Sequence, residues 1–118
     1  MEAKVISIDN LKGYQVGDEK IGTLRMIKDV LQSKNMKVHQ AIFPSKHASS
    51  QHSHPESEEI CYVAKGRGEV IIGEETKQYG PNSLVFVPSG ILHQYRNTGK
   101  EEMILIAIYS PPTENPKK

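Results

Sequence analysis

Short apolar segments separated by turn residues fill the second half of the chain, and this pattern restricts the fold more than any other feature. The segments are rich in β-branched and aromatic residues, which favour strands. They cover residues 60–63, 69–72, 84–87, 91–96 and 103–109. Glycine, proline and asparagine stand between them and mark turns. Strands that recur roughly every eight to twelve residues predict an all-β sandwich or barrel.

The first half of the chain is less regular. Residues 36–43 alternate between two faces, with Val38 and Ile42 on one face and His39 and Phe43 on the other, as expected of a strand. Residues 22–28 also look like a strand. Apolar side chains at positions 24, 27 and 31 fit a helix equally well, so periodicity leaves this choice open. Residues 44–51 form a polar loop in this interpretation.

The length of 118 residues corresponds to a single domain, which we assign to residues 1–110. The proline-rich segment 111–118 is expected to be a disordered tail. Fifteen basic and 14 acidic residues give a net charge of +1, which offers no support for nucleic acid or a membrane surface as a partner. The single cysteine, Cys61, cannot form an intrachain disulfide, and no apolar run is long enough to cross a membrane. We therefore expect a cytoplasmic protein.

Three histidines and a carboxylate are the strongest chemical signal in the sequence. His52 and His54 lie two positions apart, so they share one face of an extended segment, and Pro55 favours extended geometry for the residue before it. Glu59 follows five positions after His54, and His93 stands at the end of another apolar run. Imidazole and carboxylate together are a plausible ligand set for a divalent transition metal.

These residues resemble the two motifs of the cupin superfamily. The first motif, G-x5-H-x-H-x3,4-E-x6-G, is matched by His52, His54, Glu59 and Gly66. The second, G-x5-P-x-G-x2-H-x3-N, is matched by Pro88, Gly90, His93 and Asn97. The leading glycine of each motif is replaced, by Lys46 in the first and by Asn82 in the second. Asparagine is the next best residue after glycine for a left-handed turn position.

The resemblance implies a double-stranded β-helix, the jelly-roll barrel of the cupins, covering most of the chain. It also implies a metal site with His52, His54, Glu59 and His93 as ligands and two further positions for water, dioxygen or substrate. Iron, manganese, nickel, copper and zinc all suit these ligands. Glu58 is an alternative ligand because the family allows the shorter spacing, but the six residues between the carboxylate and Gly66 favour Glu59.

The remaining polar residues could line the pocket or have ordinary structural roles. Cys61 shares a strand face with Glu59, and Tyr95 shares one with His93, so both are candidates to line the pocket. His39 and His47 are expected to be a packed barrel residue and a loop residue rather than ligands. The arginines could attract an anionic substrate, but surface placement is their default expectation: Arg25, Arg67 and Arg96.

Two classes of function fit this interpretation. The first is a metal-dependent enzyme acting on a small polar molecule, similar to the dioxygenases, decarboxylases and sugar or sugar-phosphate isomerases of the family. The second is a non-catalytic module that binds or senses a sugar or an organic acid.

The segment 103–108 is apolar at every position, which predicts that both faces of this strand are buried. We therefore expect a two-fold homodimer packed sheet on sheet, with exchange of the first strand as an option.

Overall fold

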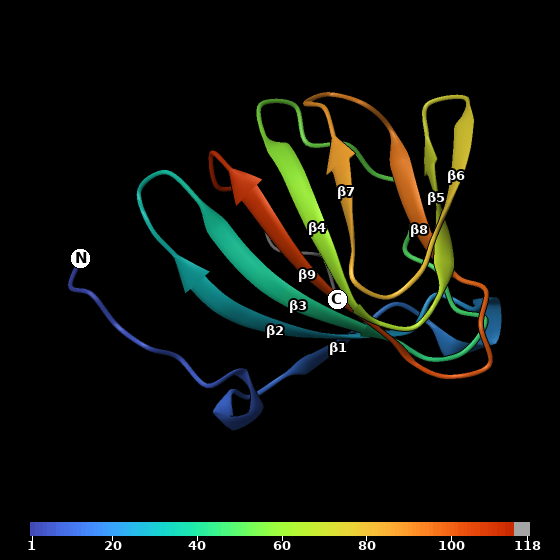
Figure 1. Cartoon of the computed structure of the whole chain (residues 1–118), viewed down its shortest axis with the longest axis horizontal. Helices are drawn as coiled ribbons and strands as arrows, with labels where there is room; N and C mark the ends of the chain where they lie inside the picture. Colours follow the sequence, from blue (N-terminus) through green and yellow to red (C-terminus); the bar gives the residue numbers. More distant parts are fainter. Residues whose placement is uncertain (115–118) are drawn as a thin grey trace.

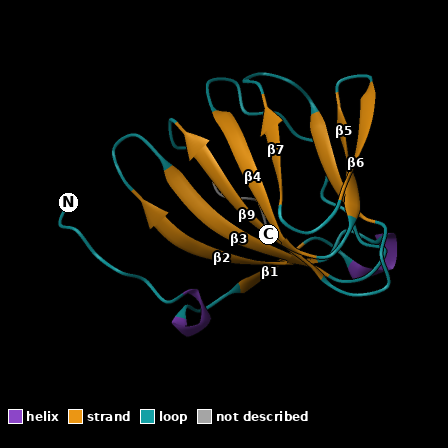
Figure 2. Ribbon diagram, viewed as in Figure 1, coloured by secondary structure: helices purple, strands orange, loops and turns teal. Residues whose placement is uncertain are grey.

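The computed structural model describes residues 1–114 and consists almost entirely of antiparallel strands (Figure 2). The larger sheet has six strands in the order β1 (Tyr14–Val16), β2 (Arg25–Gln32), β3 (Lys37–Phe43), β9 (Met103–Ser110), β4 (Glu58–Lys65) and β7 (Ser83–Val87). The smaller sheet has three, in the order β6 (Glu75–Tyr79), β5 (Gly68–Ile72) and β8 (His93–Asn97). Two 3₁₀ turns, η1 (Ile8–Asn10) and η2 (Glu19–Ile21), precede β2. The predicted all-β jelly-roll class is confirmed.

The larger sheet curves across the molecule from β1 to β7, and the smaller sheet stands beside β7 (Figure 1). Side chains alternate across each strand, so every second residue of β3, β4 and β9 points into the barrel. Register places apolar side chains at one end of the barrel, where Val63 pairs with Leu105. At the other end Glu59 pairs with Tyr109. Glu59 and Tyr109 thus give the barrel a polar end, although Asn97 is also buried near the opposite end, beside Phe43.

The ambiguous segment 24–31 belongs to a strand and not to a helix. β2 pairs with β3 along its whole length, but the register shifts between Asp29 and Leu31. A bulge of this kind adds a residue to one strand and changes which side chains face inward. The shift interrupts the strand period, which explains why the apolar spacing of this segment fits a helix as well as a strand.

The segment described as a polar loop extends the smaller sheet. Ser49 donates its amide to the carbonyl of Tyr95 at 2.8 Å, and Asn97 donates to the carbonyl of His47 at 2.9 Å. Further along, His52 and His93 exchange two backbone hydrogen bonds of 3.0 and 2.8 Å. This pairing holds His52 against β8, which carries His93.

The two positions at which the family motifs begin with glycine, here Lys46 and Asn82, have a left-handed backbone. The φ angle is 67° at Lys46 and 64° at Asn82. The turn conformation predicted for Asn82 is confirmed, and Lys46 adopts the same conformation despite its side chain. Loop geometry is thus preserved, while Lys46 carries the strain that a Cβ atom adds in this region.

Part of the segment expected to be a disordered tail contacts the barrel. The Pro111 carbonyl accepts a hydrogen bond from Ser57 Oγ at 2.6 Å, and the Thr113 carbonyl accepts one from Lys37 Nζ at 3.1 Å. Residues 111–113 thus contact the barrel, and residues 115–118, the end of the expected tail, lie outside the described part of the chain. None of the helical segments within residues 1–114 has the length and hydrophobicity to cross a bilayer.

Candidate metal centre

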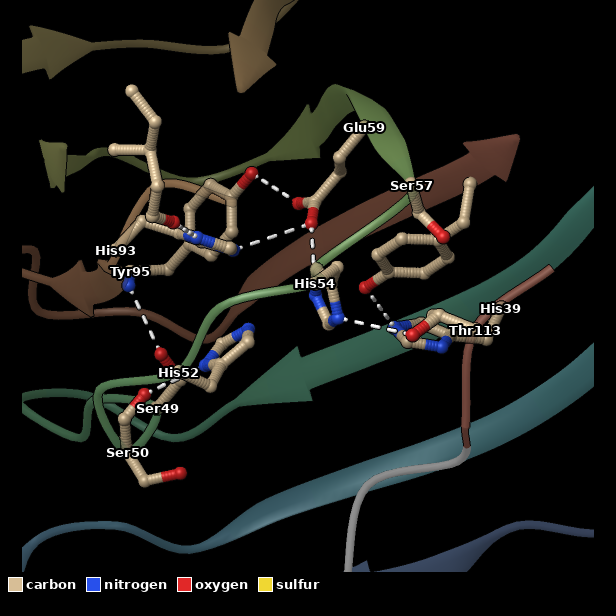
Figure 3. Close-up of polar contacts among 12 residues, drawn as sticks. His39, Ser49, Ser50, His52, His54, Ser57, Glu59, His93, Tyr95 and Thr113 are labelled. Atoms are coloured by element: carbon tan, nitrogen blue, oxygen red, sulfur yellow. Dashed lines mark hydrogen bonds and ion pairs between the residues drawn. The ribbon is translucent and has the colours of Figure 1, made fainter. Parts of the chain in front are cut away.

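Four side chains from three separate segments converge at the polar end of the barrel (Figure 3). One ligand atom from each of His52, His54, Glu59 and His93 lies within 4.8 Å of the others. Glu59 Oε1 is the shared point of this cluster, at 3.4 Å from His54 Nε2 and 3.3 Å from His93 Nε2. The geometry of the cluster can accommodate one cation.

Strand alternation determines which glutamate belongs to this cluster. Glu59 is only 1% exposed and points into the barrel, whereas Glu58, the preceding residue of β4, is exposed. Consecutive side chains of a strand point to opposite faces, so the two cannot exchange places without a shift of register. Of the two alternatives left open by the sequence, the structure places Glu59 beside the histidines.

The outer nitrogen of each imidazole is held by a hydrogen bond. His52 Nδ1 lies 2.8 Å from the Ser50 carbonyl, and His93 Nδ1 lies 2.9 Å from the Ile91 carbonyl. A carbonyl oxygen only accepts, so both rings carry their proton on Nδ1 and leave the Nε2 lone pair free. His54 Nδ1 lies 3.1 Å from Thr113 Oγ1, an atom able to accept the same kind of bond. Partners of this type orient histidine ligands of metals.

The buried atoms that face one another in the cluster have no hydrogen-bond partner among the described residues. These atoms are His54 Nε2, Glu59 Oε1 and His93 Nε2. Buried polar atoms are nearly always paired, so three unpaired acceptors around one point need an explanation. A divalent cation bound to all three provides one, and nitrogen and carboxylate donors are those that transition metals prefer. The residues present therefore fit the metal that the motif implies.

The protonation states also suit a metal. Burial by itself raises the pKa of Glu59, but His54, His93 and the hydroxyl of Tyr95 outweigh it and hold the pKa at about 2. Burial lowers the pKa of His52 to about 4. At neutral pH the carboxylate is ionised and the His52 ring is neutral, as metal binding requires. Burial by itself lowers the pKa of His93, but contact with Glu59 and the Ile91 carbonyl outweighs burial and raises it.

Three members of the cluster, His52, His54 and Glu59, form part of the wall of a cavity of about 670 Å³. Tyr95 and Cys61 also line this cavity. Tyr95 donates its hydroxyl proton to Glu59 Oε2, the carboxylate oxygen that the imidazoles leave free. Burial raises the pKa of Cys61, so its thiol stays protonated and is a poor nucleophile at neutral pH.

Several residues of the cavity were missed or assigned differently from the sequence. Thr113 lies in the expected tail, and no pattern in the sequence points to it. His39 Nε2 lies 3.2 Å from the hydroxyl of Tyr109, and both residues line the cavity. Alternation along their strands was the available signal, since it puts both on the inward face.

His47 and Arg25 were both expected to lie outside the site, His47 in a loop and Arg25 on the surface. His47 accepts a hydrogen bond from the Leu24 amide at 2.9 Å, so it ties the segment between β3 and β4 to the residue before β2 and takes no part in the cluster. The default expectation that Arg25 lies on the surface is wrong. Its side chain is 7% exposed and lines the cavity, because Arg25 falls on the inward face of β2.

Comparison with known proteins agrees with this architecture. The model of the cupin domain matches residues 38–109, which is more than half of the chain. The chain belongs to the cupin family. An uncharacterised protein of Streptomyces coelicolor is 30% identical over 82 residues, which cover 70% of this cupin and 76% of the relative.

Two solved structures share the fold of this cupin. KdgF from Halomonas sp. superposes with a TM-score of 0.80 and 18% identity, over 96% of this chain and 97% of that one. A predicted oxalate decarboxylase from Thermotoga maritima gives a TM-score of 0.82 and 16% identity, over 92% of this chain and 100% of that one. At such identities the likeness concerns the fold alone.

Proposed function

We propose that this cupin is a metal-dependent enzyme acting on a small polar molecule, with His52, His54, Glu59 and His93 as ligands of one divalent ion. The observation that carries the proposal is the group of three buried, unpaired acceptor atoms directed at one point. When bound, such an ion supplies Lewis acidity or a site for dioxygen. Iron, manganese, nickel, copper and zinc are all compatible with the ligand set.

The protein residues supply the rest of the site. Tyr95 fixes the carboxylate of Glu59 through its hydroxyl, and burial raises the pKa of Tyr95, so this donor stays protonated. The cavity provides room for a molecule larger than water. Both effects prepare one wall of the cavity for chemistry at the cluster.

A base outside the ligand set favours catalysis over simple binding. Burial lowers the pKa of His39 to about 4, so this imidazole is neutral at pH 7. Its Nδ1 atom is buried, has no partner among the described residues and belongs to a side chain that lines the cavity. In the tautomer in which Nε2 carries the ring proton and donates it to the Tyr109 oxygen, Nδ1 has a free lone pair that can accept a proton from a bound molecule. In the alternative, a non-catalytic module for a sugar or organic acid, this nitrogen would only form a hydrogen bond with the ligand.

The first experiment is elemental analysis of protein purified without added metal. We expect about one equivalent of a transition metal, and its loss in the His52→Ala/His54→Ala double variant. Retention of metal by the double variant, or lack of affinity of the wild type for every metal offered, would refute the centre. Dioxygen uptake after addition of ferrous ion, with a panel of small acids and sugars, then separates an oxygenase from a decarboxylase, an isomerase or a binding module.

Assembly and location complete the proposal. Large apolar side chains on the outer face of adjacent strands remain exposed in the single chain, with Ile60 at 46%, Phe86 at 53% and Leu84 at 71%. A contiguous apolar face of this kind is suited to a two-fold homodimer packed sheet on sheet. A monomer mass by light scattering at micromolar concentration would contradict the dimer.

A cytoplasmic location is kept as a proposal, based on the single free cysteine Cys61.

A further inference from the structure

The guanidinium of Arg25 is a positive charge inside the cavity. Arg25 is the first residue of β2 and points to the barrel interior with 7% of its surface exposed. It lines the same cavity as His52, His54 and Glu59. An arginine in this position is unusual, because arginine is almost never fully buried unless it is paired.

Protein partners account for little of this charge. Arg25 Nη1 donates to the Thr23 carbonyl at 2.6 Å, which satisfies one of the five donor hydrogens of the guanidinium. Among residues 1–114 no ion pair includes Arg25. A carbonyl oxygen carries no full charge, so the guanidinium remains electrostatically uncompensated. Burying such a cation costs free energy unless an anion joins it.

The cavity wall indicates what kind of anion fits. Apart from the histidines, Arg25 is the only basic side chain among the described residues of the wall, which also carries Glu56, Glu59 and Glu114. A single guanidinium balances one negative charge, and its planar fork matches the two oxygens of a carboxylate. A phosphate dianion would leave a negative charge uncompensated in this acidic surrounding. A monoanionic carboxylate is therefore the better complement.

We propose that Arg25 binds a carboxylate of the substrate, so that the enzyme acts on a small organic acid whose carboxylate pairs with Arg25 while another oxygen faces the metal cluster. The substrate class rests on the proposed function, since the metal end of the molecule depends on the four-ligand centre. The carboxylate end depends only on Arg25 and can be tested without metal.

The test compares acids with their matched amides. Glycolate, L-lactate and L-malate, and the amide of each, are titrated calorimetrically into the wild type in metal-free and Co²⁺-loaded form. We expect at least one acid to bind about 10- to 100-fold more tightly than its amide, because a hydrogen-bonded charge is lost in the amide. The Arg25→Met variant should lose this preference, and Arg25→Lys should keep only part of it, since lysine retains the charge without the fork. Arg67→Met, which changes an exposed arginine outside the cavity, serves as the control.

The outcomes separate this inference from the metal proposal. If no acid is preferred over its amide in the wild type, or if Arg25→Met keeps the preference, Arg25 is not a carboxylate site. This comparison within the wild type does not depend on whether a variant folds. If inorganic phosphate binds and the acids do not, the carboxylate assignment is overturned in favour of phosphate. Failure of the wild type to take up Co²⁺ refutes the metal centre alone, because the metal-free titration still measures binding at Arg25.

Discussion

Removal of the Thr113 hydroxyl should weaken metal binding although Thr113 is not itself a ligand. Its Oγ1 atom lies 3.1 Å from His54 Nδ1 and is placed to accept the proton that this nitrogen carries when Nε2 faces the cluster. Loss of such a partner generally lowers metal affinity by 10- to 100-fold. The His54 side chain is 13% exposed, so water can replace part of the lost bond. We therefore expect Thr113→Val to fall near the lower limit, about 10-fold or ~1.4 kcal/mol.

Competition titration of Zn²⁺ against a chelating indicator at pH 7.5 measures this effect. Thr113→Ser keeps the hydroxyl and should bind zinc as the wild type does. Thr76→Val removes a hydroxyl from an exposed position of β6 and controls for the general effect of the substitution. Circular dichroism checks that each variant is folded.

Equal zinc affinity of the wild type and Thr113→Val, within twofold, would refute the argument. In that case the contact between the C-terminal segment and His54 would be a packing contact without influence on the ring. A loss shared by Thr113→Ser would equally contradict it, because the hydroxyl would then not be the group responsible.

Three further predictions concern stability. Burial lowers the pKa of His39 from 6.5 to about 4, so the unfolded chain binds a proton there that the native protein does not, and stability falls as pH drops through this range. In urea titrations of metal-free protein, His39→Gln should flatten this dependence by about 1.4 kcal/mol per pH unit between pH 6 and 4.5; an unchanged slope would contradict it. Asn97→Ala should lower the free energy of unfolding by about 3 kcal/mol. The reason is that the buried Asn97 side chain donates to the carbonyls of Phe43, Pro44 and Glu101 and accepts from the amide of Gly99. Calorimetry compares this variant with Asn10→Ala, which changes an exposed residue and should have little effect. Lys46→Gly should leave stability unchanged or raise it by up to about 1 kcal/mol by relieving the left-handed backbone, and a clear loss would show that the Lys46 side chain matters more than its φ angle.

The sequence predicted those parts of the molecule that repeat or follow a fixed spacing. Alternation identified β3, and runs of strand-forming residues identified β4 and β9. The strand period of two also put Glu59 and Cys61 on one face. It could not resolve β2, because the bulge between Asp29 and Leu31 interrupts that period. Pairing of residues 47–52 with β8 also escaped prediction, since it depends on backbone hydrogen bonds between distant segments that no side-chain pattern records.

The same difference explains why the general chemistry of the site can be inferred from the sequence and the substrate cannot. The candidate ligands lie on short motifs whose spacing reflects local geometry, so His52, His54 and Glu59 are visible as a group. Outside the cluster, Arg25 gives the cavity its positive charge and Thr113 supplies a hydrogen-bonding group. Arg25 comes from an edge region of the large sheet, and Thr113 from the segment after the last strand. Each reaches the cavity only through tertiary packing, and each looks like an ordinary surface residue in isolation. Specificity in this cupin is therefore expected to follow positions outside the motifs, and relatives that share the four-residue cluster but lack a basic residue at the position of Arg25 should differ in the charge of their ligands.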